Sequence, residues 1–184
     1  MKSICVYCGS SPGDDPAFSN TAKEIGQLAA ERDWRVVYGG GRMGLMGDTA
    51  SSARDHGGKV YGVIPKFLTE IEGILEGVEH KIVETMHERK MLMFEEADVF
   101  CTLPGGIGTL EEIIETLSWA RLSLHHKPII VANINDFWSP LEELLNHIVD
   151  RQFAPDFMLK SIQFVNSAEA VFDAAEDALL RNKA

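Results

Sequence analysis

The sequence predicts a doubly wound α/β protein, with a mostly parallel sheet and helices on both faces. Short apolar runs alternate with stretches of helical periodicity along the whole chain, and this alternation is typical of βαβ units with right-handed crossovers. The runs contain few polar residues, as expected for strands that helices cover on both sides. Three runs end in turns rich in glycine or serine, and parallel strands bring such turns to one edge of the sheet.

Seven strands are expected, each an apolar run closed by glycine, proline or polar residues. In chain order they span residues 4–7, 34–38, 59–64, 81–84, 97–103, 128–134 and 162–165. Helices are expected where apolar residues recur three or four positions apart. These stretches are residues 18–29, 44–55, 86–96, 113–124, 141–149 and 168–180. Residues 67–79 carry four glutamates without a clear period, and we interpret them as a mobile loop over the site or a plain surface segment.

Composition limits the class of protein. The 184 residues fit one domain, residues 1–184. A net charge of −11 argues against binding to nucleic acid, which needs a basic surface, and against an anionic membrane. No apolar run reaches the ~18 residues of a membrane span, and the first run is too short for a signal peptide, so a cytoplasmic protein is expected. The six histidines lack metal-ligand spacing, and no metal site is expected.

The most informative stretch is residues 103–112, which predicts a strand, a glycine turn and a helix. Gly105, Gly106 and Gly108 remove side chains where the backbone turns, so that N–H groups at the positive end of the helix can approach an anion. A phosphate is the expected anion. No lysine follows the glycines, which distinguishes the stretch from a P-loop.

The same stretch has a structural interpretation. Thr109 and Glu112 have the spacing of a capping box, with threonine at the N-cap and glutamate three residues later. The two roles do not exclude each other. A carboxylate in the first turn would be held ionised by the helix dipole, which suits a group that faces a developing positive charge.

A second glycine turn resembles a dinucleotide fingerprint. Gly39, Gly41 and Gly44 match G-x-G-x-x-G after an expected strand. That fingerprint also requires an acidic residue at the end of the next strand, and this strand ends Ile64-Pro65-Lys66. A dinucleotide cofactor therefore remains a minor alternative.

Arg89 and Lys90 are the expected cationic element. A basic pair on a helix is usually solvated surface. These two residues, however, lie near the start of a helix, where acidic residues are normally preferred, and at the sheet edge that carries the glycine turns. Binding of a phosphate or a ribose hydroxyl would account for them.

Several of these segments resemble one family. Residues 104–112, Pro-Gly-Gly-Ile-Gly-Thr-Leu-Glu-Glu, match the PGGxGTxxE motif of the LONELY GUY (LOG) proteins, and residues 86–90, Met-His-Glu-Arg-Lys, resemble the second signature of that family at the family's distance. The segments 5–11, 38–41 and 63–66 are also similar. The resemblance extends to about residue 150, and residues 67–84 depart from the family's spacing by one residue.

The resemblance implies a Rossmann-like homodimer that hydrolyses the N-glycosidic bond of adenosine 5′-monophosphates, N6-modified or not, without a metal or organic cofactor. By similarity, Arg89 and Glu112 are catalytic. The nucleotide contacts expected from the resemblance and from the converging turns are Gly9, Ser10, Gly40, Gly41, Glu70, Lys90, Gly105, Gly106, Ile107, Gly108, Thr109 and Ser118, where Ser118 replaces a threonine common in plant members.

Two alternatives from other classes stay open at this point. A non-catalytic nucleotide-binding or carrier protein would keep the glycine turns and release no base. A pyridoxal-phosphate decarboxylase would need a Schiff-base lysine with a partner for the pyridinium nitrogen, and the sequence offers no such context.

Overall fold

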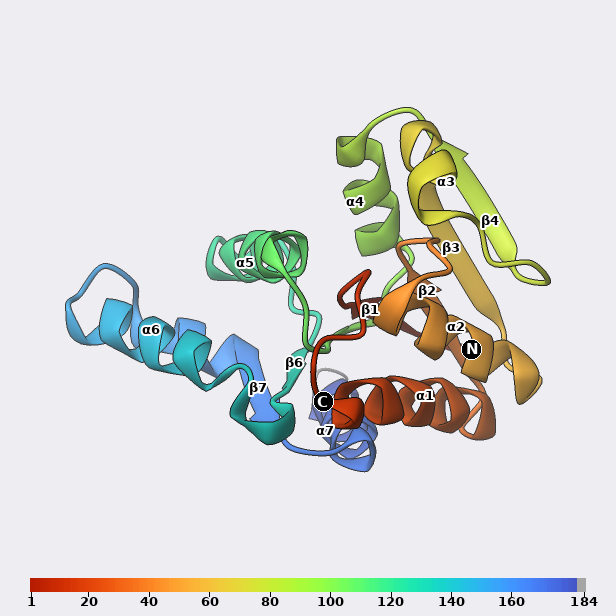
Figure 1. Cartoon of the computed structure of the whole chain (residues 1–184). Coiled ribbons are helices and arrows are strands. Elements are labelled where there is room, and N and C mark those ends of the chain that lie inside the picture. The colour runs from red at the N-terminus through yellow and green to blue at the C-terminus, as the bar shows by residue number, and fades with distance from the viewer. Residues whose placement is uncertain (182–184) are drawn as a thin grey trace.

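The computed structural model describes residues 1–181 as a seven-stranded parallel sheet with helices on both faces (Figure 1). The strands are β1 (Lys2–Tyr7), β2 (Trp34–Tyr38), β3 (Val60–Pro65), β4 (Glu79–Val83), β5 (Val99–Thr102), β6 (Ile129–Ala132) and β7 (Ile162–Val165). Every pairing is parallel, in the order β4-β3-β2-β1-β5-β6-β7. The doubly wound fold predicted from the sequence is therefore confirmed.

Within residues 1–181, six α-helices lie between consecutive strands and a seventh follows β7. They are α1 (Pro16–Glu31), α2 (Gly44–Asp55), α3 (Lys66–Glu72), α4 (Met86–Glu95), α5 (Ile107–Arg121), α6 (Ser139–Asp150) and α7 (Ala168–Arg181). Two short 3₁₀ segments, Ile134–Asp136 and Asp156–Ser161, flank α6. Residues 182–184, at the end of the chain, lie outside the described residues.

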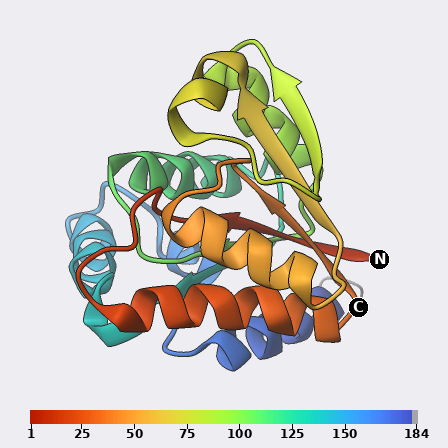
Figure 2. The ribbon, with the colours of Figure 1, turned by 45° about the vertical axis from the view of Figure 1, so that its right-hand side comes forward.

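The sheet separates two hydrophobic cores. One core packs α1, α2 and α7 against one face through side chains such as Phe18, Ala50 and Phe172. The other packs α4, α5 and α6 against the opposite face through Met93, Ile113 and Leu141. Figure 2 shows α1 and α2 side by side across one face, with α5 behind the sheet. Burial on both faces accounts for the almost uninterrupted apolar strands.

The order of the strands reverses between β1 and β5, which lie side by side at the centre of the sheet. The loops that follow these two strands meet there. Gly9 N donates a hydrogen bond to Pro104 O at 3.0 Å, and Leu103 N donates to Tyr7 O at 2.9 Å. Ligands of open α/β sheets bind in the crevice at such a switch point.

Part of residues 67–79 forms a helix on the surface, where a mobile loop or a plain surface segment was expected. They continue from β3 into α3, and Ile74 then forms an isolated bridge with Gly41. None of the α3 residues is buried, and Ile71 is 68% exposed. A helix that buries none of its residues has no apolar period, which is why the sequence pattern did not reveal it.

Candidate active site

A cavity of about 330 Å³ lies at the switch point, between the ends of β1 and β2 on one side and α4 and α5 on the other. Eight of the predicted site residues line it, from three separate parts of the chain. They are Gly9, Ser10, Arg89, Gly106, Ile107, Gly108, Thr109 and Glu112. The convergence of turns expected from the sequence is therefore observed at this edge.

The start of α5 forms one wall of the cavity. Gly106 is its N-cap, in an extended conformation, and no side chain caps the helix. The N–H groups of residues 107–109 belong to the first helical turn, where they have no intrahelical acceptor. The positive end of a 15-residue helix therefore faces the cavity, in the arrangement that binds phosphate groups.

The capping box predicted for Thr109 and Glu112 is wrong. Thr109 lies three residues beyond the N-cap and is buried, and Glu112 lies in the second turn. The box occurs instead at α4, where the Thr85 hydroxyl accepts a hydrogen bond from Glu88 N at 3.1 Å and the Glu88 carboxylate accepts one from Thr85 N at 3.1 Å. The glycine turn before α5 moves its N-cap to Gly106, which releases Glu112 from any capping role.

Arg89 extends from α4 toward the ends of two strands. Its Nε donates to Val63 O at 3.2 Å, and its Nη2 donates to Gly39 O at 3.1 Å. The residue is only 7% exposed, yet it lines the cavity. The two carbonyls fix the guanidinium while leaving further N–H groups for a ligand, since a guanidinium has five N–H donors.

Side chains of the protein itself account for two glycines of the apparent dinucleotide fingerprint. A Cβ at Gly39 would overlap the Arg89 guanidinium, and a Cβ at Gly41 would lie 2.8 Å from Glu72 Oε2. Glycine at both positions therefore leaves room for the close approach of a charged side chain. The fingerprint in the sequence thus has a local packing cause that does not involve a pyrophosphate.

Glu112 faces this cation from α5. Burial raises the pKa of its carboxyl to about 7, the neighbouring Arg89 and Lys90 charges lower it, and Glu111 and Glu115 raise it. The expectation of a group held ionised by the helix dipole is therefore wrong: Glu112 lies beyond the first turn of α5, where the dipole acts most strongly, and burial has the largest effect on its pKa. A carboxyl with a pKa near neutrality can both accept and donate a proton at the pH of a cell.

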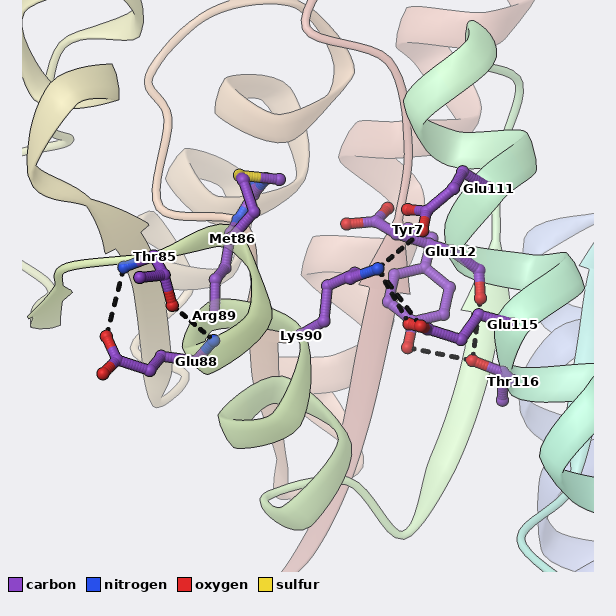
Figure 3. A network of polar contacts seen from close by, with 10 residues as sticks. All are labelled: Tyr7, Thr85, Met86, Glu88, Arg89, Lys90, Glu111, Glu112, Glu115 and Thr116. Atoms are coloured by element: carbon purple, nitrogen blue, oxygen red, sulfur yellow. Dashed lines mark hydrogen bonds and ion pairs between the residues drawn. The ribbon is translucent and has the colours of Figure 1, made fainter.

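Lys90 bridges α4 and α5 beside the cavity. Its Nζ lies 2.5 Å from Glu111 Oε1 and 3.1 Å from Glu115 Oε2 (Figure 3). The same figure shows a hydrogen bond between the hydroxyls of Tyr7 and Thr116. The Thr116 hydroxyl also donates to the backbone oxygen of Glu112 at 2.9 Å. These contacts join α5 to α4 and to β1, and they hold the turn that carries Glu112.

The structure does not bring all predicted residues to the cavity. Lys90 pairs with α5 instead, Glu70 and Ser118 are exposed, and Gly40 packs against Ile64. Gly41 contacts Glu72, and Gly105 lines an adjoining hollow of about 300 Å³. Cavity residues that the sequence analysis did not select are Val6, Cys8, Gly39, Met46, Glu72, Met86, Met93 and Glu111.

Some of these eight residues could have been identified from the sequence, and others could not. Gly39 stood in the glycine turn, and Met86 stood in the segment 86–90. Glu72 carried none, because nothing in the pattern of residues 67–79 separates it from Glu70.

A larger hollow, of about 500 Å³, lies against the start of β6 and β7 and contains none of the predicted residues. Two of its polar side chains are already engaged within the protein. Lys127 Nζ donates to Phe94 O at 2.6 Å, and His125 Nε2 lies 2.9 Å from Thr116 O. We therefore place the candidate active site at the switch point.

Residues 1–181 lack two further features. No group of three or more His, Cys, Asp or Glu side chains there could hold a metal ion. None of the helices in that range is both long and apolar enough to cross a membrane.

Comparison with known proteins adds sequence relatives. A family model described as "possible lysine decarboxylase" matches residues 46–175. The cytokinin riboside 5′-monophosphate phosphoribohydrolase of Rhodococcoides fascians is 45% identical over 148 residues, which are 79% of this chain and 75% of that protein. The enzyme LOG7 of Arabidopsis thaliana, with the same activity in its name, is 46% identical over 156 residues, 83% of this chain and 71% of that protein.

Solved structures share the fold. A molybdenum cofactor binding protein from Rippkaea orientalis has a TM-score of 0.76 at 21% identity, over 97% of this chain and 98% of that one. A molybdenum cofactor carrier protein from Chlamydomonas reinhardtii has a TM-score of 0.77 at 18% identity, over 98% and 99% of the two chains. At such identities the likeness concerns the fold alone.

Proposed function

The chain belongs to the LOG family of cytokinin riboside 5′-monophosphate phosphoribohydrolases, and from this premise we propose that it hydrolyses the N-glycosidic bond of adenosine 5′-monophosphates, N6-modified or not. The products are the free base and ribose 5-phosphate. The observation that carries the proposal is the single cavity in which Arg89, Glu112 and the uncapped start of α5 meet.

The start of α5 supplies the binding site for the 5′-phosphate. The N–H groups of residues 107–109 and the helix dipole favour a dianion there. Glu112 lies five residues beyond Ile107 on the same helix, so a phosphate at the first turn places the ribose beside the carboxylate. Binding energy from the phosphate then orients the sugar for reaction.

Hydrolysis needs a proton acceptor and a group that stabilises the leaving base. Water attacks C1′ of the ribose, the C1′–N9 bond breaks, and its electron pair leaves with the base. The Glu112 carboxylate takes the proton from the water and stabilises the positive charge on the sugar. The Arg89 guanidinium stabilises the negative charge on the base until the base is protonated.

The test is chromatography of AMP, and of its N6-isopentenyl analogue, incubated with the purified protein and with the Glu112→Gln variant. We expect free base and ribose 5-phosphate from the first protein and almost none from the variant. The ratio of the rates on AMP and on the N6-isopentenyl analogue, both with the unmodified protein, gives the base preference. Nucleotide that binds and stays intact would contradict the proposal and favour a carrier.

The proposal extends to the assembly. We infer a cytoplasmic homodimer, acting as one Rossmann-like domain over residues 1–184. Support for the dimer comes from α5 and its C-cap, where Ile107 is 82% exposed and Ile114 and Leu122 are also exposed. Large apolar side chains exposed on a surface favour a protein partner. Light scattering coupled to size-exclusion chromatography measures the mass, and a monomer at micromolar concentration would contradict the dimer.

A further inference from the structure

The carboxylate of Glu112 has no direct contact that fixes its position. Within residues 1–181, no hydrogen bond or ion pair involves this carboxylate, although the charges of Arg89 and Lys90 lie near enough to lower its pKa. A group that must meet both a water molecule and a sugar carbon needs a defined position. The backbone of α5 therefore has to set the place of Glu112, and the contacts of that backbone matter for the reaction.

Thr116, one turn beyond Glu112, connects this backbone to the sheet. Its hydroxyl donates to Glu112 O at 2.9 Å and lies 3.2 Å from the Tyr7 hydroxyl (Figure 3). A hydroxyl has a single proton, and the bond to Glu112 O uses the one on Thr116. The Tyr7 hydroxyl therefore donates to Thr116 Oγ1, and the three groups form a chain of hydrogen bonds from β1 to the backbone of Glu112.

His125 supports the same threonine from the loop after α5. Lys127 N donates to His125 Nδ1 at 3.1 Å, so this ring nitrogen carries no proton. The proton of the neutral ring is then on Nε2, which donates to Thr116 O at 2.9 Å. Burial lowers the pKa of His125, which favours the neutral ring. Thr116 thus accepts one hydrogen bond at its hydroxyl and another at its carbonyl.

The two donors share one aromatic support. The Tyr7 ring stacks on Phe100 with centroids 5.6 Å apart, and the His125 ring meets Phe100 in an edge contact at 5.9 Å. Both donors are buried. A threonine in a helix often bonds to the carbonyl four residues back, which is a local contact. At Thr116 the two buried rings add tertiary contacts, which fix this turn of α5 to the central strands of the sheet.

We propose that Tyr7 and Thr116 are positioning residues for Glu112, and that their hydroxyls hold its backbone where the carboxylate reaches the reacting sugar. The proposal rests on the function proposed above. Neither residue lines the cavity, so each acts through Glu112 rather than on the nucleotide. The N–H groups of residues 107–109, expected to bind the phosphate, lie about two turns before Thr116. Loss of either hydroxyl should therefore lower kcat more than it raises KM.

The experiment measures kcat and KM for AMP in variants that remove one hydroxyl at nearly constant volume. Tyr7→Phe and Thr116→Val should each lower kcat by about 5- to 50-fold, with KM changed by less than about threefold. Thr116→Ser, which keeps the hydroxyl, should recover most of the loss. Because the two hydroxyls act in series, the double variant should lose no more than Thr116→Val alone.

Thr49→Val is the matched control. Thr49 is a fully buried threonine of α2, on the other face of the sheet, and its hydroxyl has no hydrogen-bond partner in the described part of the chain. This variant should keep kcat. The proposal is overturned if Thr49→Val reproduces the loss, if the losses of Tyr7→Phe and Thr116→Val add in the double variant, or if Tyr7→Phe keeps the original kcat.

A second readout needs no turnover and separates this proposal from the proposed function. The difference in the free energy of unfolding between a protein and its Glu112→Gln variant depends on pH, because burial raises the pKa of Glu112. Urea unfolding measures this difference in the original protein and in the Thr116→Val background. A released turn lets the carboxylate reach water, so the pH dependence should shrink by about half or more in that background.

The titratable groups around the carboxylate are unchanged in Thr116→Val, so a smaller pH dependence would report a displaced carboxylate. They are Arg89 and Lys90 on α4, Glu111 and Glu115 on α5, and the thiols of Cys5 and Cys8 in and after β1. A reduced pH dependence supports the positioning role even if no nucleotide is hydrolysed. An unchanged pH dependence would contradict that role even if the protein hydrolyses AMP.

Discussion

Two helix starts in this molecule carry the same sequence signature and use it differently. Residues 85–88 and 109–112 are both Thr-x-x-Glu. At α4 the threonine and the glutamate cap the helix reciprocally. At α5 the N-cap is Gly106, so the threonine is buried inside the helix and the glutamate faces the cavity.

The difference shows that the residues before the signature decide its role. A helix whose first N–H groups bond to its own side chains has less capacity for an anion. The glycine turn leaves α5 with free N–H groups and places Glu112 one turn further along, opposite Arg89. The following predictions test this contrast between the two helix starts.

The largest expected effect is a difference in kcat between variants of the two glutamates, Glu112 and Glu88. Glu112→Gln should lower kcat by about 10²- to 10⁴-fold, because it removes the proton acceptor. Glu88→Gln, the same change in the α4 signature, should leave kcat within a few-fold of the original value. Steady-state kinetics on AMP measures both, and equal losses would mean that Glu112 is not specifically catalytic.

The next effect concerns the free energy of unfolding as a function of pH. Burial favours the protonated form of Glu112 in the folded state, with a pKa of about 7 against 4.5 for the ordinary group. The fold therefore loses stability as pH rises from about 4.5 to 7. Glu112→Gln should be more stable than the unmodified protein by up to about 3 kcal/mol at pH 8. The two should be equal near pH 4.

Urea unfolding at a series of pH values measures this difference. The same pKa predicts that kcat/KM falls below pH 7, since the proposed role needs the ionised carboxylate. If the difference in stability between the unmodified protein and Glu112→Gln did not change with pH, the pKa of Glu112 would not be raised in the folded state.

A third change would convert the start of α5 into one like that of α4. Gly106 has an extended conformation, and a Cβ there would meet nothing within 4 Å. Gly106→Asp should place a capping carboxylate at the N-cap and raise the free energy of unfolding by only about a few tenths of a kcal/mol, since glycine is itself a good N-cap residue. It should raise KM about 10- to 100-fold by occupying and repelling the phosphate site.

Gly106→Ala serves as the control for the third change, since it adds a side chain without charge. If Gly106→Asp left KM unchanged, the phosphate would have to bind elsewhere than on the first turn of α5.

The smallest expected effect is a loss of stability from removing the N-cap of α4. Thr85→Ala removes the hydroxyl that accepts from Glu88 N and should destabilise the protein by about 1 kcal/mol. The kinetic constants should be retained, because Thr85 does not line the cavity. Thermal unfolding with parallel kinetics measures both, and a large loss of kcat would show that the cap also positions Arg89.

The fold was largely predictable from the sequence because apolar runs alternate with helical periodicity and glycine turns follow β1, β2 and β5. The element that escaped prediction, α3, exposes Ile71 and buries none of its residues, so it has no amphipathic pattern. The shift from Thr109 to Gly106 as the N-cap of α5 also left no trace, since a glycine cap has no side chain to mark it.

The site was predictable in part. Arg89 and Lys90 adjoin in sequence and seemed a single cationic element, yet adjacent helical residues project about 100° apart. Only Arg89 therefore lines the cavity, while Lys90 pairs with α5. The choice between Glu70 and Glu72 depended on the loop after β2, whose contact with α3 is a tertiary feature.

The anchoring of Arg89 has a consequence for conformational entropy. A long side chain that becomes fixed loses up to about 2 kcal/mol of rotamer freedom. Arg89 loses this freedom when the chain folds, because the carbonyls of Val63 and Gly39 already hold its guanidinium. A ligand that enters the cavity meets an immobile cation, so association avoids an ordering cost that an arginine on an exposed loop would incur with every encounter.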